Sequence, residues 1–110
     1  MKIDITTQNI SLDDALDVFV RQKIGTLEKF INDPNNLVEV RVEIGKPSKH
    51  HRSGRIYYAE INMKVGGKLL RATSQHEDLR NAIVDVKDEL QEQIRKFKGK
   101  ETDLSRQPRE

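Results

Sequence analysis

The chain has 110 residues and a formal net charge of +2, with hydrophobic and charged residues at 35% each, which suits one domain with a modest core and a heavily charged surface. The absence of cysteine excludes disulfides, thiolate nucleophiles and cysteine-ligated metals. The N-terminal MKIDITTQNI lacks the apolar run of a signal peptide, and no stretch approaches the roughly 20 apolar residues of a membrane helix, so we expect a soluble, cytoplasmic protein with no membrane partner.

The first third of the chain predicts a strand followed by a helix. Residues 2–7 alternate between apolar and polar side chains, as a half-buried strand does. Ser11 is the expected N-cap of a helix that runs to about Phe30, where the turn residues 32–36 stop it. The buried stripe of this helix is predicted from apolar residues at helical spacing: Leu12, Leu16, Phe19, Val20, Ile24, Leu27 and Ile31.

Three further strands are predicted in the middle of the chain. Residues 38–44 and 57–65 both alternate between apolar and polar side chains. Gly66-Gly67 predicts a tight hairpin turn, because glycine tolerates positive φ at both central positions. Residues 68–73 then form the fourth strand.

A second helix is predicted near the C-terminus. Ser74 and Glu77 have the S-x-x-E spacing of a capping box, and the helix is expected to run to about Lys98 and end at Gly99. Its apolar stripe comprises Leu79, Ile83, Val86, Leu90, Ile94 and Phe97. Residues 99–110 are polar and patternless, so we predict one domain over residues 1–98 and a disordered tail over 99–110.

The predicted element order is β-α-β-β-β-α, an α+β fold. Each strand has one apolar face and each helix one apolar stripe, which favours a four-stranded sheet with both helices packed on one face. A right-handed crossover lets the first two strands pair in parallel around the first helix, and the remaining strands form an antiparallel meander. This layout is similar to that of the double-stranded-RNA-binding domain.

Cationic residues are segregated on the predicted helices. On a helical wheel, one flank of the second helix carries Arg80, Lys87 and Lys98, with Arg95 nearby, and the other side carries Asp78, Asp85, Asp88, Glu89 and Glu92. The first helix adds Lys23 and Lys29. This pattern is compatible with a solvated helix or with a surface that faces a polyanion, because lysine and arginine neutralise phosphates whatever the base sequence.

The loop between two predicted strands, GKPSKHHRSG at residues 45–54, is also rich in basic residues. With the residue after it, the loop supplies Lys46, Lys49, His50, His51, Arg52 and Arg55. We interpret it as a phosphate-facing finger, with a solvated hairpin as the alternative. Tyr58 is the one weak candidate for base stacking and is better explained as a strand residue, so we expect recognition of RNA by shape rather than by sequence.

Catalytic and metal-binding patterns are not visible in the sequence. His50 and His51 are neighbours without a third ligand, and His76 is distant in sequence. Gly66-Gly67 lacks the G-x-x-x-x-G-K-[ST] context of a phosphate-binding loop. We therefore expect a non-enzymatic protein with no catalytic residue, no metal and no cofactor.

Several short stretches resemble one known family. They are GTLEKF at residues 25–30, HEDLRNAI at residues 76–83 and LQEQIRKFK at residues 90–98, with the opening Ile5-Thr6 and the β-α-β-β-β-α order. Together they resemble the short form of the ribosome-associated inhibitor and hibernation-promoting factor family, also described as sigma-54 modulation proteins. The resemblance extends over nearly all of residues 1–98.

The resemblance implies a translation inhibitor that binds the small ribosomal subunit through 16S-type ribosomal RNA and neighbouring ribosomal proteins. Family members occupy the channel for messenger and transfer RNA and stabilise idle ribosomes under stress or in stationary phase. Lys23 and Lys29 match basic positions of the family's first helix, and Lys96 matches one near the end of its second helix. We expect a monomer away from the ribosome.

The chain departs from the family pattern at four positions. Thr26 stands where a lysine is common, Arg80 where a tyrosine is usual, and Glu89 and Glu92 where a lysine and an arginine are usual. The two glutamates weaken the expected RNA-facing role of that part of the helix, although the basic flank beside them can compensate. Two alternatives stay open: a protein-interaction regulator related to transcription, and a generic module for structured RNA.

Overall fold

In a computed structural model, the described residues form these elements in chain order: β1 (Lys2–Gln8), α1 (Asp14–Gly25), the short 3₁₀ helix η1 (Thr26–Phe30), β2 (Glu39–Gly45), β3 (Tyr57–Val65), β4 (Lys68–His76) and α2 (Leu79–Ser105). The structure describes residues 1–33, 35, 37–47 and 56–105, with residues 99–105 by their backbone alone. Among the described residues, no helix is long and apolar enough to cross a membrane.

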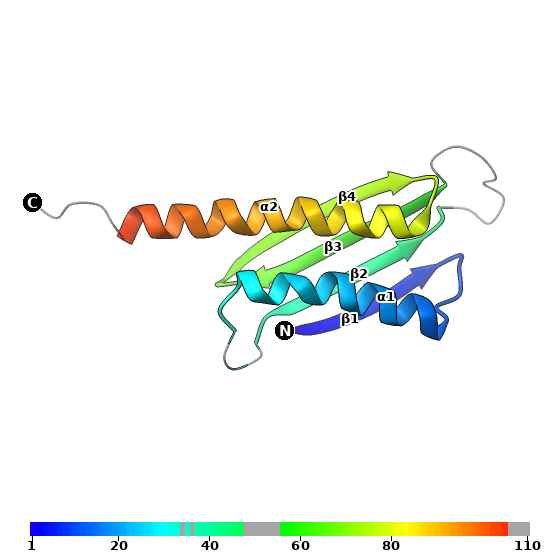
Figure 1. Cartoon of the computed structure of the whole chain (residues 1–110), viewed down its shortest axis with the longest axis horizontal. Coiled ribbons are helices and arrows are strands. Elements are labelled where there is room, and N and C mark those ends of the chain that lie inside the picture. The colour runs from blue at the N-terminus through cyan, green and yellow to red at the C-terminus, as the bar shows by residue number, and fades with distance from the viewer. Residues whose placement is uncertain (34, 36, 48–55, 106–110) are drawn as a thin grey trace, which may run out of the picture.

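The four strands form one sheet in the order β1-β2-β3-β4. β1 pairs with β2 in parallel, and β2, β3 and β4 pair antiparallel. Both helices cover the same face of the sheet, and the opposite face is open (Figure 1). The predicted α+β fold is therefore confirmed, including the parallel first pair and the meander.

The core lies between the sheet and the two helices. Alternate residues of the strands and the apolar stripes of the helices meet there, including Val42, Ile61, Ile24 and Leu90, each at most 1% exposed. Burying a side chain of this size contributes about 1.5–3 kcal/mol each. Leu12, which the sequence predicted to be buried, is 37% exposed, because it precedes the helix.

The predicted start of α1 is wrong by two residues. Asp13, not Ser11, is the N-cap, and its Oδ1 accepts a hydrogen bond of 2.7 Å from the backbone N–H of Leu16. The predicted helix also changes type before it ends. Thr26 Oγ1 donates to the carbonyl of Lys23 at 2.6 Å, and the chain tightens there into η1.

The predicted capping box at Ser74 is also wrong. β4 continues to His76, and the first turn of α2 is capped by Asp78, whose Oδ1 accepts from the backbone N–H of Arg80 at 2.8 Å and of Asn81 at 3.4 Å. Strand pairing with β3 keeps Ser74 extended, so it cannot cap a helix.

The C-terminal helix is longer than predicted. α2 continues through Gly99 to Ser105. A single glycine inside a helix costs only about 1 kcal/mol relative to alanine, which its lysine and glutamate neighbours offset in part. The division into a domain at 1–98 and a tail at 99–110 stays a prediction, and residues 106–110 lie outside the described part.

Candidate nucleic-acid interface

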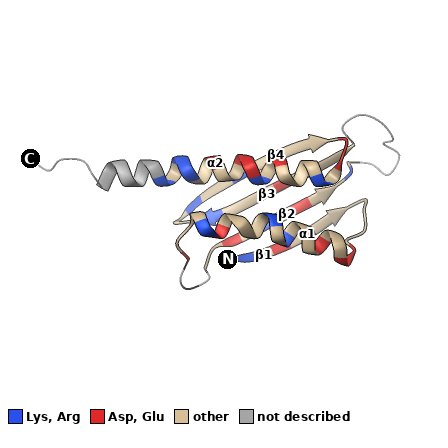
Figure 2. Cartoon of the chain, viewed as in Figure 1, with Lys and Arg blue, Asp and Glu red and all other residues tan. Residues whose placement is uncertain are grey.

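Charge is distributed along α1 and η1 with opposite signs at the two ends of this segment. Asp13, Asp14 and Asp17 lie at the start of α1, and Lys23 and Lys29 follow towards its end and in η1 (Figure 2). Acids at the start and cations at the end complement the helix dipole. The same arrangement concentrates positive charge on one part of the helical layer.

A cluster at the contact between the two helices joins cations from separate elements. Lys23 Nζ of α1 lies 5.6 Å from the ring centroid of Phe19, and Arg80 Cζ of α2 lies 4.7 Å from the same centroid. Both are within the range of cation–π attraction. Sequence reasoning assigned Phe19 to the core stripe only, although a lysine four residues later, one turn along the same helix, was the available signal.

Further cations follow Arg80 along α2. Lys87 lies seven residues later and Lys98 eleven residues after that, spacings that return to the same flank of a helix. Lys87 is 18% exposed and its Nζ lies 2.6 Å from Asp88 Oδ1. Arg95, on the outer surface, pairs with Glu92 at 3.7 Å. Cations therefore recur along this flank of α2, and two of them are paired with carboxylates.

Lys96 lies on the other side of α2. Its neighbour Gln93 donates from Nε2 to the carbonyl of Arg71 in β4 at 2.7 Å. Lys96 borders a hollow of about 250 Å³ that is lined by Lys68, Leu69, Leu70, Gln93, Lys96 and Phe97. The structure therefore separates Lys96 from the Phe19 cluster.

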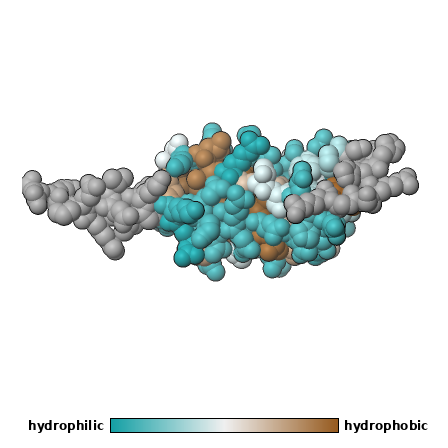
Figure 3. Space-filling view, turned by 90° about the horizontal axis from the view of Figure 1, so that it is seen from above, coloured by the Kyte–Doolittle hydropathy of each residue, from teal (hydrophilic) through white to brown (hydrophobic). Residues whose placement is uncertain are grey.

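Figure 3, seen from above relative to Figure 1, shows a mostly hydrophilic surface with small hydrophobic patches.

The remaining predicted RNA-binding residues belong to η1 and the β2–β3 loop. Lys29 Nζ lies 5.1 Å from the Phe30 ring centroid, and Lys46 Nζ lies 5.4 Å from that of Tyr57. The carbonyl of Lys46 accepts from Asn9 Nδ2 at 2.8 Å, which fixes the start of the loop. Five other predicted residues lie outside the described residues: Lys49, His50, His51, Arg52 and Arg55.

The open face of the sheet has mixed charge and internal hydrogen bonds. Arg71 of β4 pairs with Glu60 of β3 at 3.1 Å. Tyr58 donates from its hydroxyl to Glu43 Oε2 at 2.9 Å and also contacts Gln8 Oε1. Burial, together with the hydrogen bond to Glu43, raises the pKa of Tyr58 to about 12. On this face, Arg71 is therefore already paired with a carboxylate, and the Tyr58 hydroxyl already donates to one.

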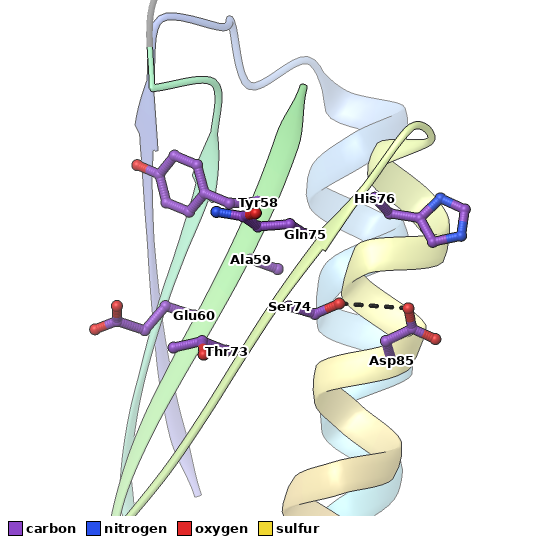
Figure 4. A pocket seen from close by; sticks show the side chains of 8 residues that line it. All are labelled: Tyr58, Ala59, Glu60, Thr73, Ser74, Gln75, His76 and Asp85. Carbon is purple, nitrogen blue, oxygen red and sulfur yellow. Dashed lines mark hydrogen bonds between the residues drawn. The ribbon is translucent and has the colours of Figure 1, made fainter. Parts of the chain in front are cut away.

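A hollow of about 590 Å³ lies at the β4 edge near the start of α2 (Figure 4). Ser74 Oγ donates to Asp85 Oδ2 at 3.3 Å, and His76 Nδ1 accepts from the backbone N–H of Asp78 at 3.0 Å. Ser74 is thus paired with the carboxylate of Asp85 and not with the imidazole of His76. The Nδ1 atom of that imidazole is instead occupied by the backbone N–H two residues later. The described residues also contain no cluster of three or more His, Asp or Glu suited to a metal ion.

The helical layer and the sheet match known proteins over most of the chain. Residues 3–102 match the family described as "Sigma 54 modulation protein / S30EA ribosomal protein". The chain belongs to this family. The family resemblance predicted from the sequence is therefore confirmed, and we refer to the S30EA family below.

Two curated relatives carry the same printed name, "Ribosome hibernation promotion factor". The protein from Lactococcus lactis subsp. cremoris is 30% identical over 99% of this chain and 54% of its own length. The protein from Staphylococcus aureus is 28% identical over 89% of this chain and 48% of its own length. The chain thus spans about half the length of these S30EA relatives.

Two solved structures share the fold. The N-terminal domain of Thermus thermophilus Protein Y aligns with a TM-score of 0.72 at 26% identity, covering 88% of this chain and 99% of that domain. A ribosomal subunit interface protein from Coxiella burnetii aligns with a TM-score of 0.70 at 17% identity, covering 90% and 99% respectively, and this likeness concerns the fold alone.

Proposed function

We propose that the chain is a ribosome-binding translation inhibitor that occupies the messenger and transfer RNA channel of the small ribosomal subunit. The observation that carries the proposal is that Lys23 of α1 and Arg80 of α2 both lie within cation–π range of the Phe19 ring in the helical layer. Membership of the S30EA family and the names of the curated relatives support a ribosomal target.

Inhibition requires no catalysis in this mechanism. The cationic flank neutralises phosphates of folded ribosomal RNA and releases their counterions, which supplies affinity independent of base sequence. The rigid α+β layer then occupies space that messenger and transfer RNA need. An idle ribosome that holds the chain cannot initiate translation and is stabilised in that state in the cytoplasm under stress or in stationary phase.

The basic loop between β2 and β3 supplies additional contacts in this proposal. Lys46 at its start is held by Asn9 and Tyr57, and the further cations Lys49 and Arg52 follow in sequence. We expect Lys49→Glu combined with Arg52→Glu to weaken binding and to flatten its salt dependence. Unchanged affinity and slope would identify the loop as a solvated turn.

Sedimentation with purified ribosomal subunits tests the proposal. We expect stoichiometric binding to the small subunit, loss of binding when the subunit carries messenger and transfer RNA, and much weaker binding to free duplex RNA. Comparable affinity for free duplex RNA would identify a generic RNA-binding module. Binding to neither RNA would favour a protein-interaction regulator.

A further inference from the structure

Phe19 links the cationic side chains of the two helices. Its ring is half-buried on α1, and both Lys23 Nζ and Arg80 Cζ lie within cation–π range of the same ring centroid, at 5.6 and 4.7 Å. We propose that Phe19 is a positioning residue that holds Lys23 and Arg80 together, so that the two side chains bind one RNA phosphate group. This inference rests on the proposed function, and names the chemistry of one contact.

An aromatic ring holds a cation without neutralising it. Several other cations of the helical layer are paired with carboxylates: Arg21 with Asp17 at 3.1 Å, Lys87 with Asp88 at 2.6 Å and Arg95 with Glu92 at 3.7 Å. Over the part of the chain that the structure describes, neither Lys23 nor Arg80 forms such an ion pair. Neither charge is therefore held by a direct ion pair among these residues, although Arg80 lines a hollow that Asp13, Glu77 and Asp78 also line.

The ring itself is fixed by the core. Phe19 packs against the core cluster, and its neighbours on α1, Leu16 and Val20, are 8% and 0% exposed. Lysine and arginine lose much rotamer freedom when they are fixed in a complex. Because the ring restricts both side chains before binding, part of this loss of side-chain entropy has already occurred in the free protein.

The geometry favours a phosphate over a nucleobase as the ligand. A base would have to stack on the ring of Phe19, but two cations already lie over that ring. Lysine and the guanidinium of arginine offer only N–H donors, and a phosphate offers acceptor oxygens, so the two sets are complementary. One phosphate can accept from both side chains at once.

Binding of four variants to small ribosomal subunits, measured at several salt concentrations, tests the inference. Phe19→Leu removes the ring but keeps an apolar side chain, and Phe19→Tyr keeps the ring. The third variant carries Lys23→Gln and Arg80→Gln together. The fourth, a triple variant, adds Phe19→Leu to that double variant. We expect Phe19→Leu to lose about three- to tenfold in affinity with an unchanged salt slope, because both charges remain. Phe19→Tyr should bind within about twofold of the wild type.

The triple variant separates positioning from folding. It carries the same packing change as Phe19→Leu, so a loss caused by weakened folding would appear in both backgrounds. We expect no further loss when Phe19→Leu is added to the double variant. An equal loss in both backgrounds, or no loss in either, overturns the inference while the proposed function stands. Absence of wild-type binding to small subunits overturns both.

Discussion

The α-amino group of Met1 forms an ion pair with Asp33 Oδ2 at 2.8 Å. The other oxygen of Asp33 accepts from the backbone N–H of Leu37 at 2.6 Å, and Oδ2 also accepts from that of Val38 at 3.1 Å. The side chains of Met1 and Asp33 are 1% and 4% exposed. This contact therefore fastens the start of β1 to the segment that leads into β2.

The pH dependence of stability tests this contact. The hydrogen bond from the N-terminal amine lowers the pKa of Asp33 below 3.8, and the same bond raises the pKa of the amine above 8.0. The contribution of Asp33 to the free energy of unfolding is fully present above pH 3.8 and is lost as the pH falls through the pKa of Asp33 in the folded protein. The contribution of the amine is fully present below pH 8.0 and is lost as the pH rises through the pKa of the amine in the folded protein. Thermal unfolding of wild type and Asp33→Asn should differ most between those values. A difference that is constant with pH contradicts the ion pair.

Gly45 at the end of β2 is required by close approach to β1. A Cβ built on Gly45 would lie 2.0 Å from the carbonyl oxygen of Gln8. We expect Gly45→Ala to lower the free energy of unfolding by about 1–3 kcal/mol, because the strands must move apart. Gly25→Ala is the matched control, since nothing lies within 4 Å of its added Cβ, and it should be neutral or stabilising. Equal effects in denaturant titrations would show that the strands can separate freely.

The cap of α2 can be tested by comparing two single substitutions. Asp78→Ala removes the acceptor for the N–H groups of Arg80 and Asn81, which should cost about 1 kcal/mol. Ser74→Ala removes one hydrogen bond between exposed groups, to Asp85, and should cost less. Chemical unfolding of both variants provides the measurement. A larger loss for Ser74→Ala would support the capping box predicted from the sequence.

The role of the helical face can be tested by reversing one charge on each face of the molecule. Arg80 lies in the helical layer at Phe19, and Arg71 lies on the open face, 61% exposed. We expect Arg80→Glu to weaken binding to small subunits by roughly tenfold or more and to reduce the salt slope by about one. Arg71→Glu should have little effect on binding. Similar losses for both variants would mean that only net charge matters.

Strand alternation and helical spacing were sufficient to predict the sheet, its connectivity and most of the core. These patterns depend on one element at a time, and a half-buried strand such as β2 has only one way to bury Val40, Val42 and Ile44 together. The helix ends were harder to predict because capping residues compete. Asp13 lies two residues after Ser11, and Asp78 lies four residues after Ser74. Which residue caps each helix therefore depends on where the packing of α1 and β4 sets the first helical turn.

The candidate site could be predicted only in part. A helical wheel predicts that Arg80 and Lys87 share one flank of α2. It could not bring Lys23 and Arg80 to the same Phe19 ring, because that depends on how α1 packs against α2. Lys96 was grouped with them through the family resemblance. Its actual position beside Lys68 follows from the flank of α2 that faces β4, which no single-helix pattern specifies.

The most direct test is an electron cryomicroscopy structure of the chain bound to the small ribosomal subunit at side-chain resolution. We expect Lys23 and Arg80 within hydrogen-bond distance of ribosomal RNA phosphates in the messenger and transfer RNA channel, with the open face of the sheet turned away. A complex that contacts RNA through the open face, or lies outside the channel, contradicts the proposed function.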